Sequence, residues 1–291
     1  MRSFIKKNHK TTEAKRLTNI KTIKKAILET VSGSREKITP IALEKMASEK
    51  YALGKKQIKS VIQGLIAGGE LTYTYQYGST FLEKSFNRPV RISKHVVIKP
   101  PENSFASKPG DVVINLAQGA SFGTGQHATT RLAVKGIDYV LKECGYFKEN
   151  KKTCLLDVGT GSGMLVIAAV LMGIKKGVGI DIDPCAIAEA KENIKINGLE
   201  HRIDICDRAF EKINRVFSIV TANLRYPTIK RLLPRMLETV NKKGFVILSG
   251  IKTDEIKDLL DIYQEKNFLC RWKETEQGWI GVVFEKTATT Q

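Results

Sequence analysis

The chain has 291 residues, of which 42% are hydrophobic, which fits one large or two ordinary globular domains and excludes disorder throughout. The longest apolar run, Met164–Met172, is about half of a membrane span, and the lysine-rich first forty residues lack the apolar core of a signal peptide. The five cysteines form no C-x-x-C pair, which argues against a zinc site and favours reduced thiols. We therefore expect a soluble cytoplasmic protein with no membrane segment and no bound metal.

The positive charge is concentrated in the first third of the chain. Residues 1–100 carry 21 Lys and Arg against 7 Glu, a net charge of +14, whereas the remaining 191 residues have a net charge of +4. A positive module attracts nucleic acid, a ribosomal surface or acidic lipid, and charge alone does not choose between them. A solvated basic surface that only keeps the protein soluble would give the same composition.

In chain order, the pattern first predicts three short helices. They begin at Thr18, at Thr39-Pro40 and after Gly54, and the first ends near Gly33. Their apolar faces are Ile20, Ile23, Ile27 and Val31 in the first, Ile41, Leu43, Met46 and Ala47 in the second, and Ile58, Val61, Ile62 and Leu65 in the third. The opposite face of the third helix carries Lys55, Lys56 and Lys59.

A β-hairpin is expected after these helices. Tyr73, Tyr75 and Tyr77 alternate along its first strand and so share one face, and Gly78-Ser79 forms the turn. Three helices followed by a hairpin resemble a winged helix-turn-helix, in which the third helix is the natural candidate for a nucleic-acid groove. The alternative is a protein-docking module whose tyrosines pack under the hairpin. We expect this basic, winged-helix-like substrate-recognition domain to span residues 1–88.

The remainder, residues 89–291, reads as an α/β domain. Beyond a connection at Pro100-Pro101, apolar strands alternate with helical segments, which implies a mostly parallel sheet with helices on both faces. The expected strands are 153–158, 177–181, 217–222, 244–248 and 279–284.

A glycine-rich loop follows the first of these strands. Asp157 leads into Gly159, Gly161 and Gly163, and such glycines let a backbone approach a ligand that a β-carbon would exclude. Asp181 ends the next strand, 18 residues past the last glycine, where it could accept hydrogen bonds from both ribose hydroxyls. The pattern D-x-G-x-G-x-G differs from the G-x-G-x-x-G pattern of NAD sites. It resembles the loop of class I S-adenosylmethionine-dependent methyltransferases, which have a Rossmann-like fold with a seven-stranded sheet.

A narrower resemblance lies upstream of this loop and near the C-terminus. The segment Lys108–Thr130, with Phe122-Gly-Thr-Gly-Gln-His-Ala-Thr-Thr130, is similar to the PrmA family, whose members methylate amino groups of a large-subunit ribosomal protein. Thr221-Ala-Asn-Leu224, Leu248-Ser-Gly-Ile251 and Gln277–Val283 match further family segments, so the resemblance covers roughly residues 90–287. It implies S-adenosyl-L-methionine as cofactor, with family contacts that fall on Thr130, Gly159, Asp181 and Asn223. Together with Asp157, Gly161 and Gly163 of the glycine-rich loop, these are the candidate cofactor-binding residues.

The family pattern is not matched everywhere. Gln118-Gly-Ala-Ser-Phe122 replaces the family's P-G-L-A-F, and the family's N-terminal domain is an α/β module, unlike the three basic helices expected here. The catalytic half is therefore shared, whereas the recognition half differs.

Asn223 is the candidate catalytic residue, because its amide oxygen can orient an attacking amine. Tyr226 could line the target pocket or stack on a base, or it could simply pack at the start of the following helix. His127 could shuttle a proton, or serve in loop-closing hydrogen bonds. Asp207 could approach the adenine amino group or be a surface acid.

These residues predict a cytoplasmic S-adenosylmethionine-dependent N-methyltransferase acting on amino groups of a protein, such as a ribosomal protein. The alternative is methylation of an RNA or DNA base, guided by nucleic-acid binding through residues 1–88. A third possibility is a regulatory nucleic-acid binder that only senses the cofactor, although a pure sensor has no need of the orienting amide of Asn223.

Overall fold

The computed structural model describes residues 20–34, 36–76, 78–117, 123, 125, 127–144 and 153–287. Within these ranges the chain divides between Arg88 and Pro89 into two compact units. Thr18, Tyr77 and residues 118–122, on which parts of the sequence prediction rest, lie outside the described ranges.

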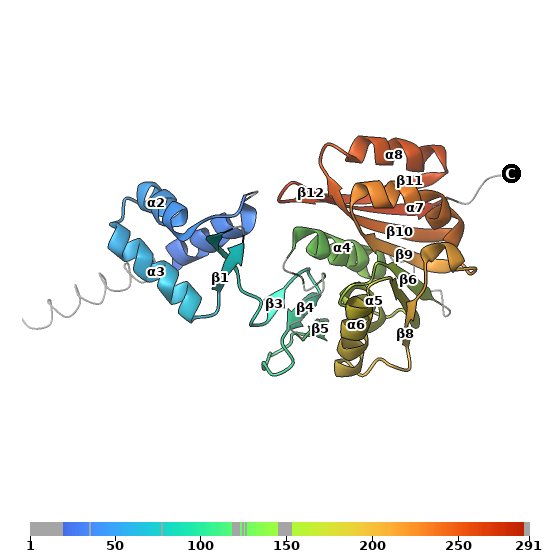
Figure 1. Cartoon of the computed structure of the whole chain (residues 1–291), viewed down its shortest axis with the longest axis horizontal. Helices are drawn as coiled ribbons and strands as arrows, with labels where there is room; N and C mark the ends of the chain where they lie inside the picture. Colours follow the sequence, from blue (N-terminus) through green and yellow to red (C-terminus); the bar gives the residue numbers. More distant parts are fainter. Residues whose placement is uncertain are drawn as a thin grey trace, which may run out of the picture. The chain divides into compact units, whose positions relative to one another are not determined.

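The first unit contains the expected helices and hairpin (Figure 1). A helix over residues 20–33 is followed by α2 (Pro40–Tyr51), α3 (Lys55–Ala67) and the antiparallel strands β1 (Leu71–Gln76) and β2 (Ser79–Lys84). The Thr39 hydroxyl caps α2 by accepting the Ala42 backbone N–H, as its place before a proline predicts. A single bridge between Ile38 and Leu82 adds a third segment to the hairpin.

Ile41 and Met46 were expected in the core of this unit, and that expectation is wrong. Their side chains are 81% and 49% exposed, whereas Leu43 and Ala47 are buried. At 100° per residue, Leu43 and Ala47 share one narrow face of α2, and Ile41 lies on the opposite side. On β1, Tyr73 and Tyr75 are exposed on one face, so they do not pack under the hairpin.

The second unit is built on a seven-stranded sheet, and the predicted mostly parallel α/β architecture is confirmed. Its strands are β6 (Cys154–Val158), β7 (Lys176–Asp181), β8 (Ile203–Asp207), β9 (Phe217–Asn223), β10 (Val240–Lys252), β11 (Phe268–Glu276) and β12 (Trp279–Lys286). Their order is β11-β12-β10-β9-β6-β7-β8, and only β12 runs against its neighbours. The chain order reverses beside β6, which creates the topological switch point where such sheets bind ligands.

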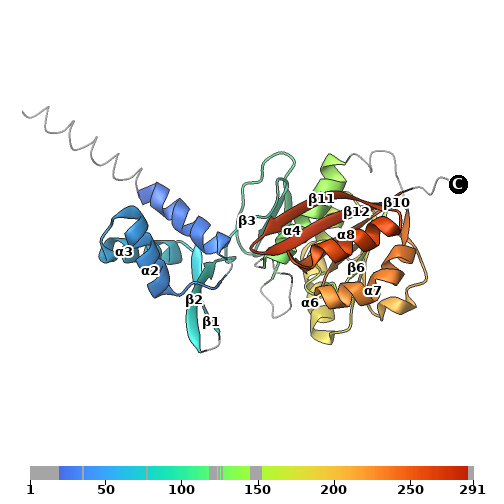
Figure 2. The same ribbon diagram turned by 90° about the horizontal axis from the view of Figure 1, so that it is seen from above.

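Helices cover both faces of this sheet (Figures 1 and 2). Val246 and Val282 belong to one core cluster, which they form with α7 (Tyr226–Thr239) and α8 (Ile256–Glu265). The next residues along the strands, Ile247 and Val283, pack against Gly136 of α4 on the opposite face. That face is covered by α4 (Ala128–Asp138), α5 (Met164–Leu171) and α6 (Pro184–Ile196).

A small sheet of β3 (Val90–Arg91), β4 (Val96–Lys99) and β5 (Val112–Asn115) precedes the large one. Asn193 of α6 and Asn197, the C-cap of that helix, hold the chain that leaves the small sheet. Asn197 Oδ1 accepts the Asn115 N–H, and Asn193 Oδ1 accepts the Ala117 N–H, both at 3.0 Å. Among the described residues, no helix has the length and apolarity needed to cross a membrane.

Candidate functional site

A cavity of about 740 Å³ opens along the edge of the large sheet where the parallel strands end. The strand ends that line it follow the sheet order, from Trp279 through Gly250, Asn223 and Gly159 to Asp181. We call the part at Gly159 and Asp181 the β6–β8 half, and the part at Asn223, Gly250 and Trp279 the β9–β12 half. The cavity therefore spans the switch point and has the size of a small-molecule site.

The β6–β8 half is formed by the glycine-rich loop, which lies on the end of β7. The Gly159 and Thr160 backbone N–H groups both donate to the Ile180 carbonyl, at 2.9 and 3.0 Å. Gly159 has φ +71°, and a β-carbon there would clash with Leu224; Gly163 has φ +79° and packs tightly on Ala190 of α6. At these two positions the left-handed backbone itself favours glycine, in addition to any approach of a ligand.

Asp157 lies beneath this loop and is fully buried. The Thr160 and Thr221 hydroxyls each donate to its carboxylate at 2.7 Å. Its pKa is raised to about 6, mainly by burial and to a smaller extent by the nearby charge of Asp181, although the two hydroxyls favour the ionised form. Asp157 thus ties the loop to β9 from below, and it is not among the residues that line the cavity.

Asp181 lies at the cavity wall, and backbone donors hold its carboxylate. Oδ2 accepts the Gly161 N–H at 2.9 Å, and Oδ1 accepts the Ile182 and Asp183 N–H groups at 2.8 and 3.1 Å. A carboxylate has about four acceptor positions, so this leaves about one for another donor.

The β9–β12 half contains Asn223. Its Nδ2 donates to the Thr130 hydroxyl at 3.3 Å, which joins the end of β9 to the first turn of α4. No described residue donates to its Oδ1, so the arrangement supplies an oxygen acceptor at the cavity wall. An acceptor of this kind can align an amine or another N–H donor.

His127 and Trp279 form the remaining wall of that half. His127 is the N-cap of α4, where Nδ1 accepts the Thr129 N–H at 3.3 Å and lies 2.8 Å from the Thr129 hydroxyl. Its ring meets the Trp279 ring edge-on, with centroids 5.3 Å apart and an interplanar angle of 65°. The position of His127 therefore fits the loop-closing alternative of the sequence prediction.

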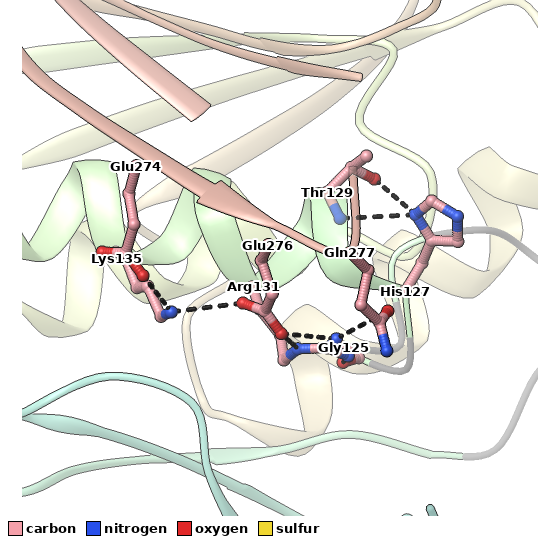
Figure 3. A network of polar contacts seen from close by, with 8 residues as sticks. All are labelled: Gly125, His127, Thr129, Arg131, Lys135, Glu274, Glu276 and Gln277. Atoms are coloured by element: carbon pink, nitrogen blue, oxygen red, sulfur yellow. Dashed lines mark hydrogen bonds and ion pairs between the residues drawn. The ribbon is translucent and has the colours of Figure 1, made fainter. Parts of the chain in front are cut away.

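Behind this wall, charged side chains connect α4 to β11 (Figure 3). Arg131 Nε donates to Glu276 at 2.6 Å, and its guanidinium also reaches the Gly125 carbonyl and Gln277 Oε1, at 3.2 and 3.4 Å. Lys135 donates to Glu274 at 2.5 Å and to Glu276 at 3.2 Å. Burial alone would raise the pKa of Glu276, but the charges and hydrogen bonds of Arg131 and Lys135 outweigh it and lower the pKa.

The structure brings five of the predicted site residues into the cavity wall: Thr130, Gly159, Gly161, Asp181 and Asn223. Asp157 and Gly163 lie behind it. Tyr226 packs in the core at the start of α7, and its hydroxyl donates to Asp258 at 2.5 Å. Asp207 ends β8 on the surface, while the next residue, Arg208, lines the cavity. Among the described residues, no group of three or more His, Cys, Asp or Glu is arranged to hold a metal.

Two residues that form or support the cavity wall, Asn193 and Trp279, were not singled out from the sequence. Asn193 of α6 is fully buried and donates to the Ser162 carbonyl at 2.9 Å, which supports the glycine-rich loop from the α6 side. Trp279 was noted only as part of a matching segment, although an aromatic residue directly after the Gln277-Gly278 turn was a usable signal.

Comparisons with known proteins show which family the chain resembles. A family model described as "Ribosomal protein L11 methyltransferase (PrmA)" matches residues 80–287. A ribosomal protein L11 methyltransferase of Geobacter sp. (strain M21) is 34% identical over 201 residues, which are 68% of this chain and 64% of that protein. Its counterpart in Geobacter sulfurreducens is 40% identical over 166 residues, 57% of this chain and 52% of that protein.

The fold of the chain is also similar to that of a solved structure. The ribosomal protein L11 methylase of Lactobacillus delbrueckii subsp. bulgaricus superposes with a TM-score of 0.61 at 28% identity, covering 69% of this chain and all of that one. The chain spans less than two thirds of the length of these curated relatives, and most of the first unit lies outside the matched region.

Proposed function

The chain belongs to the PrmA family of ribosomal protein L11 methyltransferases, and from this we propose that it is an S-adenosylmethionine-dependent N-methyltransferase acting on amino groups of a protein. The observation that carries the proposal is the cavity at the switch point, which combines a glycine-rich loop, the acid Asp181 and the amide of Asn223. The substrate proposed first is a ribosomal protein, the class named for the relatives, which would make the reaction cytoplasmic.

The residues present fit S-adenosylmethionine as the cofactor. The β6–β8 half offers a glycine-rich loop and about one acceptor position on Asp181, which suits a ribose hydroxyl better than the pair of hydroxyls expected from the sequence. In this proposal Gly159, Gly161 and Asp181 hold the cofactor in the β6–β8 half, and Thr130 and Asn223 line the wall between its methyl group and the acceptor. Asp157 and Gly163 act by holding the loop. When bound, S-adenosylmethionine supplies an electrophilic methyl group.

The β9–β12 half would receive the acceptor amine. Asn223 Oδ1 accepts an N–H of the amine and orients its lone pair, while the bond from Nδ2 to Thr130 fixes the amide plane. A lysine amine with a pKa near 10.4 costs roughly 4–5 kcal/mol to deprotonate at pH 7. Desolvation in the cavity and a neighbouring positive charge both favour the neutral amine, so positioning supplies much of the catalysis.

We assign substrate recognition to the first unit, residues 1–88, with nucleic acid as an additional partner. On α3, Lys55, Lys56 and Lys59 are exposed, and the helix has no acidic residue. Exposed Tyr73 and Tyr75 on β1 add stacking surfaces. This basic surface also supports the second candidate function, methylation of an RNA or DNA base.

The first experiment incubates the enzyme with radiolabelled S-adenosylmethionine and an unmethylated lysate, and then treats parallel samples with protease or nuclease. Label lost on protease treatment supports a protein substrate, and the labelled band identifies it. Label lost on nuclease treatment moves the assignment to a nucleic-acid base. No incorporation, together with retained binding of S-adenosylhomocysteine, would favour a cofactor sensor.

Asp181→Ala tests the cofactor assignment directly. We expect weaker binding of S-adenosylhomocysteine in calorimetry, because a charged hydrogen bond to the ribose is lost. Asp207→Ala is the matched control, since Asp207 occupies the equivalent end of the neighbouring strand outside the cavity wall. An unchanged dissociation constant in Asp181→Ala would remove this residue from the cofactor site.

A further inference from the structure

The connection between α4 and β11 lies behind the cavity and takes no part in the site described above. Arg131 is its centre, with a side chain that is only 13% exposed. It contacts three groups in two segments: the Gly125 carbonyl before α4, and the side chains of Glu276 and Gln277, where β11 ends and the next turn begins.

Both segments lead directly to a residue of the cavity wall, because His127 follows Gly125 by two positions and Trp279 follows Gln277 by two positions. Arg131 itself directly follows a third wall residue, Thr130. Gln277 has φ +52°, a left-handed conformation that is strained for a residue with a side chain. A hydrogen bond from Arg131 therefore stabilises the tight turn from which Trp279 projects.

His127, Thr130 and Trp279 all lie on one side of the cavity. Trp279 is the first residue of β12, and the hydrogen bond from Asn223 to Thr130 ties α4, with its N-cap His127, to β9. All three residues therefore belong to the β9–β12 half. The glycine-rich loop and Asp181 form the other half. If the cofactor occupies the β6–β8 half, as the proposed function requires, the wall of His127 and Trp279 faces the acceptor.

We propose that Arg131 is a positioning residue, which fixes His127 and Trp279 as the acceptor-side wall of the cavity through Glu276, Gln277 and the Gly125 carbonyl. The inference rests on the proposed function for the identity of the acceptor, but the positioning itself can be measured without activity.

The chemistry of arginine explains why one side chain performs this role. Its guanidinium is planar and carries five N–H donors in a rigid fork, so it can serve a carboxylate, an amide oxygen and a backbone carbonyl at once. A lysine is a single flexible ammonium and cannot hold the same three groups in one geometry. Arg131→Lys should therefore retain the charge pair with Glu276 while recovering only part of the positioning.

The test uses Trp279 as its own reporter. The chain has two tryptophans, so Trp272→Phe leaves Trp279 as the only one. In this background we compare Arg131→Met, Arg131→Lys and the control Arg271→Met. Arg271 forms an ion pair with Glu285 at 2.6 Å on the same hairpin of strands, but outside the cavity wall.

We expect Arg131→Met to shift the Trp279 emission to longer wavelength and to increase its quenching by acrylamide, with Arg131→Lys intermediate and Arg271→Met unchanged. Binding of S-adenosylhomocysteine should be retained in all three. With ribosomal protein L11 as acceptor, kcat/KM for Arg131→Met should fall about 10- to 100-fold, because small displacements near the reacting groups are costly.

The outcomes separate the two proposals. A wild-type protein that does not bind S-adenosylhomocysteine would refute the proposed function, and the Trp279 signal would still decide on Arg131. Trp279 emission and quenching in Arg131→Met identical to those in Arg271→Met would overturn the inference. If Arg131→Met does not fold, Glu276→Gln removes the charge partner with little change in shape, and the same comparison applies.

Discussion

Asp157 shows how a single buried carboxylate can act on the site without lining it. Among the described residues, the Thr160 and Thr221 hydroxyls donate to its carboxylate, and the residue is fully buried. Burial penalises the ionised form more strongly than two neutral donors stabilise it, so its pKa is raised to about 6. The loop that forms the β6–β8 half therefore rests on a group whose charge changes between acid and neutral pH.

This gives a pH dependence with a definite sign. Because the pKa is about 6 in the folded protein and 3.8 for the unperturbed group, the folded state holds the proton more tightly. The contribution of Asp157 to the free energy of unfolding therefore falls as the pH rises from about 4 to 6, by about 3 kcal/mol in all. Asp157→Asn should remove this dependence.

Urea unfolding of wild type and Asp157→Asn between pH 4 and pH 7 measures the effect as a difference in unfolding free energy. Thr221→Val, which removes one donor to the carboxylate, should move the transition to higher pH. A wild-type minus Asp157→Asn difference that stays constant over this range would contradict the prediction.

Asn223 is predicted to act on the chemical step and not on cofactor binding. Asn223→Ala removes the Oδ1 acceptor and the bond to Thr130, so the acceptor loses its orientation. We expect kcat to fall on the order of 100-fold while the dissociation constant of S-adenosylhomocysteine stays the same. Ser249→Ala is the control, since Ser249 pairs with Asn223 in the sheet but does not line the cavity. A normal kcat in Asn223→Ala would exclude it from the mechanism.

At the scale of helices and strands, local patterns predicted those elements whose apolar residues are buried. A continuous apolar run closed by glycines predicts the strand β6 and the glycine-rich loop. The i, i+3, i+4 spacing of apolar residues predicts α3. The strand β11 was missed because it lies at the sheet edge, where most of Phe268–Glu276 is exposed and polar. An edge strand of this kind gives no apolar run to detect.

For the site as well, local sequence patterns predicted some residues and missed others. The glycines, Asp181 and Asn223 stand at strand ends, so their meeting at one sheet edge could be predicted from the pattern of elements. The contact of Arg131 with Glu276 joins residues 145 positions apart, and it depends on α4 lying over β11. No local spacing contains that information, which is why the wall formed with Trp279 was not predicted.

The exposed lysines of α3 lead to a prediction about nucleic-acid binding. Replacing Lys55, Lys56 and Lys59 with Gln should weaken binding to a short RNA duplex, because up to three phosphate contacts are lost. The slope of log K against log salt should become shallower by up to about 2.7, at about 0.9 per contact. The control replaces Lys45 and Lys50 of α2, a helix that also carries Glu44 and Glu49. If both variants keep the wild-type slope, α3 is not the binding surface.

At the scale of the whole molecule, charge and cavity are separated along the chain. The basic excess lies within residues 1–100, whereas every described residue that lines the cavity lies between Gly123 and Trp279. The matched family model likewise covers residues 80–287 and leaves most of the first unit unmatched. This division suggests that recognition and methyl transfer are energetically separable.

A fragment of residues 89–291 tests that separation. Since the fragment contains every described residue of the cavity wall and the network that supports it, we expect it to fold and to bind S-adenosylhomocysteine with the affinity of the full chain. In the proposed function the first unit binds the substrate away from the reacting atoms, and such contacts act equally in the ground and transition states. Their loss should therefore raise KM for the acceptor and leave kcat largely intact. Steady-state kinetics with the acceptor identified by radiolabelling measures both constants. A folded fragment with unchanged KM would remove the first unit from substrate recognition, whereas a fall in kcat alone would mean that it contributes to the chemical step.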